Sequence, residues 1–302
     1  HATIRRQRQM CIRDSLRYGT FGKNSKENCH PFLRQNNWMT RNLVVAGNFN
    51  LTNVDELFDL LVNIGQHPKE VSDTITVIEK IGHFLDQENN RLFKEYNEKG
   101  FNNKEISSLI AKNMDIPSIL KNASMDWDGG YTMAGLIGHG DAFVLRDPNG
   151  IRPAFWYEDD EVLVVTSERP VIQTAFNVKW ENVNELKPGH ALIVKKDFEL
   201  KEVEINSPSN LQKCSFERIY FSRGTDKDIY KERLMLGSLV TPQVLEAVNF
   251  DLKRTVFSFI PNTAEMSYYG MIKATEDYLS GVKKKKIQEL EQNDPKYQEK
   301  LD

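Results

Sequence analysis

The chain has 302 residues, a net charge of −3 and a hydrophobic content of 39%, enough for a sizeable core. The slightly acidic balance excludes a general electrostatic attraction to nucleic acid. No run approaches the roughly 18 apolar residues of a membrane span. Three cysteines, Cys11, Cys29 and Cys214, are too few and too scattered for a disulfide framework or a zinc site. We therefore expect a soluble, cytoplasmic protein with no nucleic-acid or membrane partner.

Residues 1–15 differ in composition from the rest of the chain. They carry four arginines against the single acid Asp14 and have no apolar centre, so they lack the pattern of a secretory signal. An arginine-rich transit peptide is an alternative, but such peptides are also rich in serine. We interpret the segment as foreign or disordered. A first domain is then expected at residues 16–213 and a second at residues 214–302.

The first protein-like motif places Arg17 in a short loop rich in glycine. Two glycines and Thr20 surround this arginine within residues 16–22, which predicts a tight loop that aims one guanidinium group. A planar fork of donors suits a carboxylate ligand. The alternative is a surface arginine beside a turn.

An apolar strand that runs into three asparagines and then into an amphipathic helix is predicted for residues 44–64. Asn53, with Glu56 three residues later, matches an asparagine form of the capping box, and Gly65 ends the helix. A strand–turn–helix of this kind presents backbone N–H groups and carboxamides to a small pocket, as an oxyanion hole requires. The alternative is that the asparagines serve only the turn.

The central part of the chain changes from a helical to an alternating pattern. A second amphipathic helix, capped by Ser72 or Asp73, precedes polar surface helices in residues 86–122. Turn signals then separate strands expected at residues 131–137, 142–146, 153–157, 162–166 and 191–194, with a short helix at 170–176. Helices followed by an antiparallel meander predict an α+β fold with helices on the outer faces of the sheets.

The last part of the chain has the pattern of a parallel α/β unit. A connecting strand, a helix, a continuous apolar strand and a second helix are expected at residues 214–221, 231–248, 255–260 and 266–278. Because one strand cannot make a finished sheet, we expect this domain to be truncated. The lysine run at residues 283–286 is interpreted as a solvated helix face.

Four motifs stand in order, at residues 17–22, 47–53, 146–153 and 214–221. Together they resemble the amidophosphoribosyltransferases, also called glutamine phosphoribosylpyrophosphate amidotransferases, over about residues 16–280. The first two motifs are shared with all class II glutamine amidotransferases. The fourth, with residues 261–263, favours this family over the glucosamine-phosphate synthase and asparagine synthetase types. The resemblance implies glutamine hydrolysis and transfer of the ammonia to phosphoribosyl pyrophosphate, giving phosphoribosylamine in the first step of purine synthesis.

The resemblance also implies an architecture, cofactors and partners. Residues 16–213 would form a four-layer αββα N-terminal-nucleophile hydrolase domain, and residues 214–302 the start of an α/β phosphoribosyltransferase domain. Glutamine and phosphoribosyl pyrophosphate would be the substrates, and the family commonly forms homo-oligomers. Mg²⁺ is expected in the complete enzyme, at a site beyond Asp302. Some relatives carry an iron–sulfur cluster. Cys214 is one candidate ligand for such a cluster, and the alternative is that Cys214 has only a structural role. No metal site is expected in this chain.

The resemblance implies the following roles for individual residues. Arg17 would bind the α-carboxylate of glutamine, and Thr20 would help to shape that pocket. Asn48 would donate from its carboxamide, and Phe49 from its backbone N–H, to the oxyanion formed at the side-chain amide. Asp73 would pair with the α-ammonium group.

Two departures from the family pattern bear on activity. The family's nucleophile is a cysteine at the very N-terminus, with its own α-amino group as base. His1 stands first here, and Cys11 has no free amine, so we expect no glutaminase activity from this chain. Phe49 stands where many relatives have glycine, and this change leaves the backbone N–H donor of residue 49 in place.

Two alternatives to this function remain. The chain could belong to another class II amidotransferase, or it could be a non-catalytic module that senses glutamine with Arg17 and Asp73.

Overall fold

The structure, a computed structural model, describes residues 30–66, 68, 72–289, 296 and 299. Arg17 and Thr20 lie outside the described residues. The chain divides into two compact units, His1–Cys214 and Ser215–Asp302. The first unit combines helices with antiparallel strands, as expected for the α+β class.

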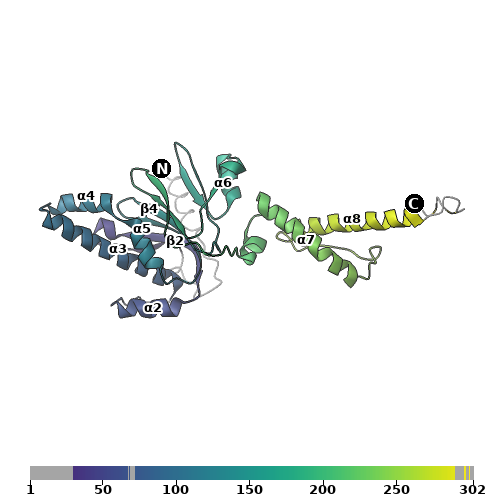
Figure 1. The fold of residues 1–302 in the computed structure, drawn as a ribbon, viewed down its shortest axis with the longest axis horizontal. Helices are drawn as coiled ribbons and strands as arrows, with labels where there is room; N and C mark the ends of the chain where they lie inside the picture. Colours follow the sequence, from purple (N-terminus) through teal and green to yellow (C-terminus); the bar gives the residue numbers. More distant parts are fainter. Residues whose placement is uncertain (1–29, 67, 69–71, 290–295, 297–298, 300–302) are drawn as a thin grey trace, which may run out of the picture. The chain divides into compact units, whose positions relative to one another are not determined.

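The described strands of the first unit form two antiparallel sheets (Figure 1). The larger sheet contains, in spatial order, β1 (Phe32–Arg34), β2 (Leu43–Leu51), β3 (Gly129–Ile137), β4 (Ala142–Arg146), β8 (His190–Val194) and β9 (Leu200–Glu204). The smaller sheet contains β6 (Leu163–Thr166), β5 (Phe155–Glu158) and β7 (Asn184–Glu185). The five strands predicted from alternation are confirmed as β3, β4, β5, β6 and β8. Three strands were not predicted from the sequence: β1 and β7, which are very short, and β9, which has little apolar content.

Four helices cover one face of the larger sheet (Figure 1). They are α2 (Val54–Asn63), α3 (Asp73–Glu98), α4 (Asn103–Asn113) and α5 (Ile116–Ser124). The main core lies between these helices and the odd-numbered positions of β2 and β3, such as Val45 and Met133. The helices predicted within residues 86–122 are confirmed, but each also has a buried face, since Ile110 of α4 and Leu120 of α5 are fully buried in this core. Their polar neighbours lie on the opposite faces of the same helices.

A second, smaller core lies between the two sheets. Val144 of β4 and Leu192 of β8 pack there against Ala154 and Leu186. The short helix α6 (Arg169–Phe176), which the sequence predicts at residues 170–176, packs on β5 and β6. The even-numbered positions of β4 and β8 therefore face the smaller sheet, and the odd-numbered positions face the helices.

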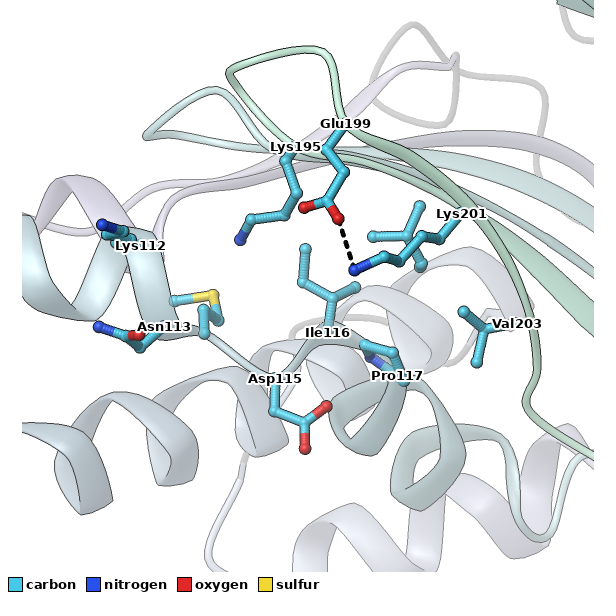
Figure 2. A pocket seen from close by; sticks show the side chains of 11 residues that line it. Lys112, Asn113, Asp115, Ile116, Pro117, Lys195, Glu199, Lys201 and Val203 are labelled. Atoms are coloured by element: carbon cyan, nitrogen blue, oxygen red, sulfur yellow. Dashed lines mark ion pairs between the residues drawn. The ribbon is translucent and has the colours of Figure 1, made fainter.

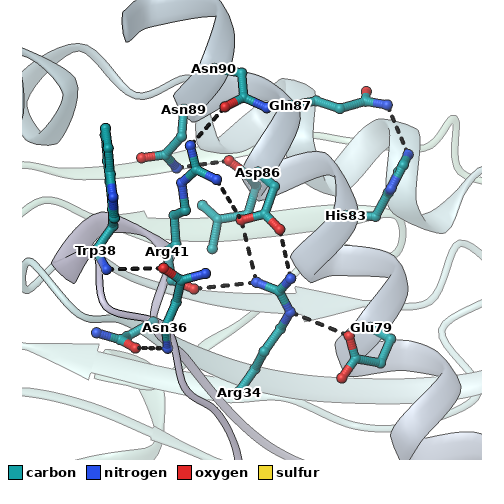
Figure 3. Close-up of polar contacts among 12 residues, drawn as sticks. Arg34, Asn36, Trp38, Arg41, Glu79, His83, Asp86, Gln87, Asn89 and Asn90 are labelled. Carbon is teal, nitrogen blue, oxygen red and sulfur yellow. Dashed lines mark hydrogen bonds and ion pairs between the residues drawn. The ribbon is translucent and has the colours of Figure 1, made fainter. Parts of the chain in front are cut away.

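A cluster of charged side chains holds β1 and the short helix η2 (Met39–Arg41) against α3 (Figure 3). Arg34 donates to Asp86 Oδ2 at 2.6 Å and to Glu79 Oε2 at 3.3 Å. In the buried part of the contact between η2 and α3, Thr40 donates to Asn89 Oδ1 at 2.5 Å. These bonds fix the edge strand next to β2, where the expected site lies.

The described part of the second unit consists of η4 (Glu217–Phe221), α7 (Lys227–Ala247) and α8 (Glu265–Glu289). The strand predicted at residues 214–221 is wrong, because residues 217–221 form a π-helix. The aromatic rings of Phe216, Tyr220 and Phe221 gather there at helical spacing, with centroids 5.2 to 5.4 Å apart. The two helices predicted further on are confirmed as α7 and α8, and the lysine run is exposed on α8.

The apolar strand predicted at residues 255–260 is also wrong. The segment is not paired with another strand, and Val256 and Ile260 are 93% and 83% exposed. Its other face contacts α8, where the Phe259 and Tyr268 rings lie 5.0 Å apart. A strand requires a hydrogen-bonded neighbour, and the described residues of this unit provide none. Among the helices of the described ranges, none is both long and apolar enough to cross a membrane.

Candidate functional site

The expected strand–turn–helix is present, but its turn is shorter than the sequence suggests. Strand β2 continues through Asn48 and Asn50 to Leu51, and α2 begins at Val54. Only Thr52 and Asn53 form the turn. The asparagines therefore lie in the sheet, and the alternative that they serve only the turn does not hold for Asn48 or Asn50.

The predicted capping box at the start of α2 is wrong. Asn53 occupies the N-cap position without a side-chain cap bond. Its Nδ2 donates to the Asp126 carbonyl at 2.9 Å, and its Oδ1 accepts from the Asp128 N–H at 3.2 Å. Asn53 therefore fastens the loop that leads into β3. The predicted helix end at Gly65 is correct, because this residue has a left-handed φ of 88° and donates to the Val62 carbonyl.

The register between β2 and β3 decides where the backbone groups of this stretch point. Asn48 lies opposite Thr132, and in the same register Thr52 N–H donates to the Asp128 carbonyl at 2.9 Å. Bonded and non-bonded pairs alternate along an antiparallel ladder. The backbone of Asn48 is therefore bonded to β3, whereas the N–H of Phe49 points to the opposite edge of β2.

The edge of β2 toward which Phe49 N–H points is the edge that β1 covers only in part. The described β1 begins at Phe32, which lies opposite Val45. Phe49 lies four residues further along β2, past this end of β1. Its backbone N–H is therefore outside both described ladders.

The side chains of Asn48 and Phe49 lie on opposite faces of the sheet. Asn48 is exposed on the even-numbered face, the face that β4 turns toward the smaller sheet. The ring of Phe49 is half-buried against the main core and meets the His30 ring at 5.4 Å. A phenylalanine at this position therefore does not occupy the face on which the Asn48 carboxamide lies.

A buried arginine and aspartate build the loop that follows β4. The Arg146 guanidinium donates to the carbonyls of Arg152, at 2.7 Å, and of Gly150, at 3.3 Å. The Asp147 carboxylate accepts from the backbone N–H groups of Ile151 and Arg152 at 2.9 and 3.0 Å. The third motif of the sequence thus shapes a loop from within. A Cβ on Gly130 would lie 2.6 Å from Ile151 Cγ2, so this loop covers the nearby end of β3.

Asp73 lies at the first position of α3, where Ser72 is the N-cap and accepts from Ile75 N–H at 3.2 Å. Of the two capping candidates, Ser72 is therefore the correct one. The Asp73 carboxylate is buried and accepts from Thr74 N–H at 2.8 Å. The N-terminus of a helix stabilises a carboxylate. Helix α3 packs on β2, but no hydrogen bond joins Asp73 to Asn48 among the described residues.

A cavity of about 270 Å³ lies elsewhere, between the start of α5 and strands β8 and β9 (Figure 2). Lys201 faces it in an ion pair with Glu199 at 2.6 Å, and Lys195 is paired with Asp141. Neither Asn48 nor Asp73 lines this cavity. Two of its cations are thus already neutralised, and it is not the expected glutamine site.

Asp141 is the centre of a buried charged cluster in the turn between β3 and β4. His139 Nε2 lies 3.0 Å from its carboxylate, Lys195 forms an ion pair with it, and Lys196 N–H donates to it at 2.9 Å. Burial alone would raise the pKa of Asp141, but the hydrogen bonds from Lys195 and Lys196, together with the nearby His139, outweigh it and lower the pKa. The described residues contain no group of three or more His, Cys, Asp or Glu side chains that could hold a metal.

The first unit is thus an α+β domain in which two donors, the Asn48 carboxamide and the Phe49 N–H, lie at one strand of a two-sheet core. No protein-family model matches the chain. Curated relatives do match: the chain is 29% identical to the amidophosphoribosyltransferase of Archaeoglobus fulgidus over 230 residues, which is 74% of this chain and 43% of that protein. It is 27% identical to the Escherichia coli amidophosphoribosyltransferase over 82% of this chain and 46% of that protein.

Solved structures have a similar fold. The glutamine phosphoribosylpyrophosphate amidotransferase of B. subtilis, complexed with ADP and GMP, matches with a TM-score of 0.56 and 23% identity, over 85% of this chain and 49% of that one. A structure described as the allosteric regulatory enzyme of purine biosynthesis matches with a TM-score of 0.59 and 24% identity, over 85% and 48%. The chain thus spans less than half the length of these proteins.

Proposed function

We propose that the first unit is a class II glutamine amidotransferase domain of the N-terminal-nucleophile hydrolase type. In the complete protein it would release ammonia from glutamine for transfer to phosphoribosyl pyrophosphate, as in an amidophosphoribosyltransferase. Relatives with this name match about three quarters of the chain, and the four sequence motifs support the same activity. The names of these relatives favour it over the glucosamine-phosphate synthase and asparagine synthetase types.

The observation that carries this proposal is the placement of two different donors side by side on β2. The β2–β3 register engages the backbone of Asn48 and directs the N–H of Phe49 to the other edge. Asn48 can therefore contribute only its exposed carboxamide, and Phe49 only its backbone. Attack on the side-chain amide of glutamine places negative charge on one oxygen. Two preorganised N–H donors stabilise such an oxyanion.

Substrate selection would depend on charges at the other end of glutamine. Asp73 would pair with the α-ammonium group, since the start of α3 keeps a buried carboxylate at this position. Arg17 would bind the α-carboxylate, with Thr20 beside it. Opposite charges held at two points distinguish an amino acid from other amides.

For the second unit we propose the opening part of a phosphoribosyltransferase domain. Mg²⁺ would act in the complete enzyme; the described residues contain no group of three or more side chains suited to a metal. An iron–sulfur cluster with Cys214 as a ligand is not supported by the described residues, which contain no group of three or more candidate ligands. Assembly into a homo-oligomer and a cytoplasmic location complete the proposal.

Calorimetry with glutamine and two truncated analogues tests the substrate assignment. Glutaramate lacks the α-ammonium group, and 4-aminobutanamide lacks the α-carboxylate. We expect L-glutamine to bind, and each analogue to bind at least about tenfold more weakly, because each analogue loses a charged contact. Arg17→Ala should remove the preference for the carboxylate only. Equal affinity for all three compounds, or no binding of glutamine, would contradict the proposal.

Ammonia release tests the catalytic assignment separately. A form of the protein whose first residue is a cysteine, as the resemblance requires, is expected to hydrolyse glutamine. In that form Asn48→Ala should lower kcat by about 10²–10³, the usual effect of removing one oxyanion donor. If the cysteine-first form folds and stays inactive even with phosphoribosyl pyrophosphate present, the roles given to Asn48 and Phe49 are wrong.

A further inference from the structure

A third polar side chain lies next to Asn48 on the same face of the larger sheet. Thr132 of β3 is directly opposite Asn48 of β2 and also directly opposite Arg146 of β4. Opposite residues of an antiparallel pair project from the same face, with Cβ atoms about 4.5–5.5 Å apart. The three residues therefore form one row across three neighbouring strands.

Arg146, at one end of this row, is fully engaged elsewhere. Its guanidinium donates to the carbonyls of Arg152 and Gly150 and also to Glu185 Oε1, at 3.0 Å. These bonds draw the guanidinium into the loop after β4 and the smaller sheet. Asn48 is thus the remaining polar side chain directly opposite Thr132.

The hydroxyl of Thr132 is enclosed without a partner. Its Oγ1 is buried and makes no hydrogen bond among the described residues, whereas Ala134 and Leu136, further along the same face of β3, are exposed. The Thr132 hydroxyl is buried and these two residues are not, because Thr132 lies nearer the end of β3 where the loop carrying Ile151 covers Gly130. Buried hydroxyl groups in native proteins usually have a partner, so this one calls for a specific explanation.

We propose that Thr132 is a positioning residue for Asn48. The bond between them is not made in the structure, but a rotation of the exposed Asn48 side chain lets Thr132 Oγ1 accept one of the two Nδ2–H bonds of the carboxamide, and the second N–H then faces the oxyanion. The two ends of a carboxamide have nearly the same shape but opposite hydrogen-bonding roles. A flipped Asn48 would present Oδ1, an acceptor, to a developing negative charge. The inference rests on the proposed function for the nature of the ligand, but not for the contact between the two side chains.

The contact can be tested in the ligand-free protein by NMR of the Asn48 side-chain amide, assigned by its loss in Asn48→Ala. Thr132→Val keeps the shape of the residue and removes the hydroxyl, whereas Thr132→Ser keeps the hydroxyl. We expect the Nδ2 proton shifts to move in Thr132→Val and to stay near the wild-type values in Thr132→Ser. The matched control is Thr166→Val, which removes a strand hydroxyl bonded to the Glu168 carbonyl at 2.8 Å in the smaller sheet. It should leave the Asn48 signals unchanged.

Unchanged Asn48 signals in a folded Thr132→Val protein would overturn the proposal. Equal changes in the valine and serine variants would also overturn it, because the effect would then not depend on the hydroxyl. If Thr132→Val does not fold, Thr132→Ala replaces it with the same two criteria.

A glutamine titration separates this inference from the proposed function. We expect Thr132→Val to weaken glutamine binding about fivefold, the effect of one hydrogen bond, and Thr132→Ser to restore it. If the wild-type protein does not bind glutamine, the proposed function fails, and the NMR comparison still decides the role of Thr132. If glutamine binds equally well to the wild-type and valine proteins while the Asn48 signals are unchanged, only the positioning role fails.

Discussion

The side chain of Arg34 crosses α3 directly over Gly82. A Cβ atom on Gly82 would lie 2.4 Å from both Cδ and Nε of Arg34, well inside van der Waals contact. Beyond this crossing the guanidinium reaches Asp86 at 2.6 Å and Glu79 at 3.3 Å (Figure 3). A glycine in the middle of a long helix thus lets an edge-strand arginine reach its carboxylates. The contact holds β1 beside the strand that carries Asn48.

We predict that Gly82→Ala destabilises the protein by about 1–3 kcal/mol, as overpacking does. At an unobstructed helix position the same change stabilises by roughly 0.5–1 kcal/mol. Urea unfolding would measure the difference. Arg34→Ala removes the obstruction, so adding Gly82→Ala to that variant should be neutral or stabilising. An equal loss of stability in both backgrounds would show that Arg34 is not the cause.

The buried carboxylate of Asp141 should make stability depend on acid pH. Folding lowers its pKa below the usual 3.8, so the folded state binds fewer protons than the unfolded state in acid. The stabilisation is complete above that usual value and is lost as the pH falls through the lower, folded-state pKa. We predict that Asp141→Asn lowers the free energy of unfolding by roughly 1.5–3 kcal/mol at neutral pH. The difference from wild type should shrink in unfolding curves recorded at progressively lower pH below 3.8.

Glu199→Gln, which also replaces a carboxylate by its amide, is the control for that experiment. Glu199 pairs with Lys201 at 2.6 Å and both side chains are more than half exposed, and exposed pairs contribute about 0–1 kcal/mol. Its replacement should therefore change stability little at any pH. If both variants behave alike, the burial of the Asp141 cluster is not the source of the acid dependence.

Most strands of the first unit can be predicted from the local sequence pattern, but the arrangement of the candidate site cannot. Alternation and turn residues are enough to predict β3, β4, β5, β6 and β8, because each of these strands has one buried face. The pairing of Asn48 with Thr132 depends on the register between two strands, in which these residues are 84 positions apart in the sequence. Periodicity does not contain that information, so Thr132 could not be predicted from the sequence as a neighbour of Asn48. Knowledge of the β2–β3 register would have been the signal needed.

In the second unit the local sequence pattern predicts a strand that does not form. Residues 255–260 have the composition of a buried strand, yet Val256 and Ile260 are largely exposed. Strand formation depends on a partner that local composition cannot supply. The π-helix at residues 217–221 was missed for a related reason, since aromatic residues favour both strands and packed helical turns. The two helices, whose hydrogen bonds are local, were predicted correctly.

Two glycines set the spacing of those helices in the second unit. A Cβ on Gly237 of α7 would lie 1.8 Å from the Ser267 carbonyl oxygen, and one on Gly270 of α8 would lie 2.0 Å from the Leu234 carbonyl oxygen. We predict that Gly237→Ala or Gly270→Ala separates α7 from α8 and accelerates hydrogen exchange in both helices. Gly281→Ala, in α8 with no atom within 4 Å of its added methyl group, should slow exchange instead. Similar exchange in all three variants would contradict this close packing.

Asp73→Asn provides the sharpest test of substrate recognition by the described residues. The change keeps the size of the side chain and an acceptor for the Thr74 N–H bond, but it removes the charge proposed to meet the α-ammonium group of glutamine. We predict that glutamine affinity falls about tenfold or more, since hydrogen bonds to charged groups contribute about 1.5–3 kcal/mol. Glutaramate, which has no ammonium group, should bind both proteins equally.

The control for Asp73→Asn is Asp115→Asn, a second aspartate at a helix start. Asp115 caps α5 by accepting from Ser118 N–H at 3.1 Å, and asparagine caps about as well. This variant should bind glutamine as the wild-type protein does. If Asp73→Asn weakens glutamine and glutaramate binding to the same extent, the loss reflects a general disturbance of the start of α3. Asp73 would then have no direct contact with the ammonium group, and the orientation proposed for glutamine would have to be reversed or abandoned.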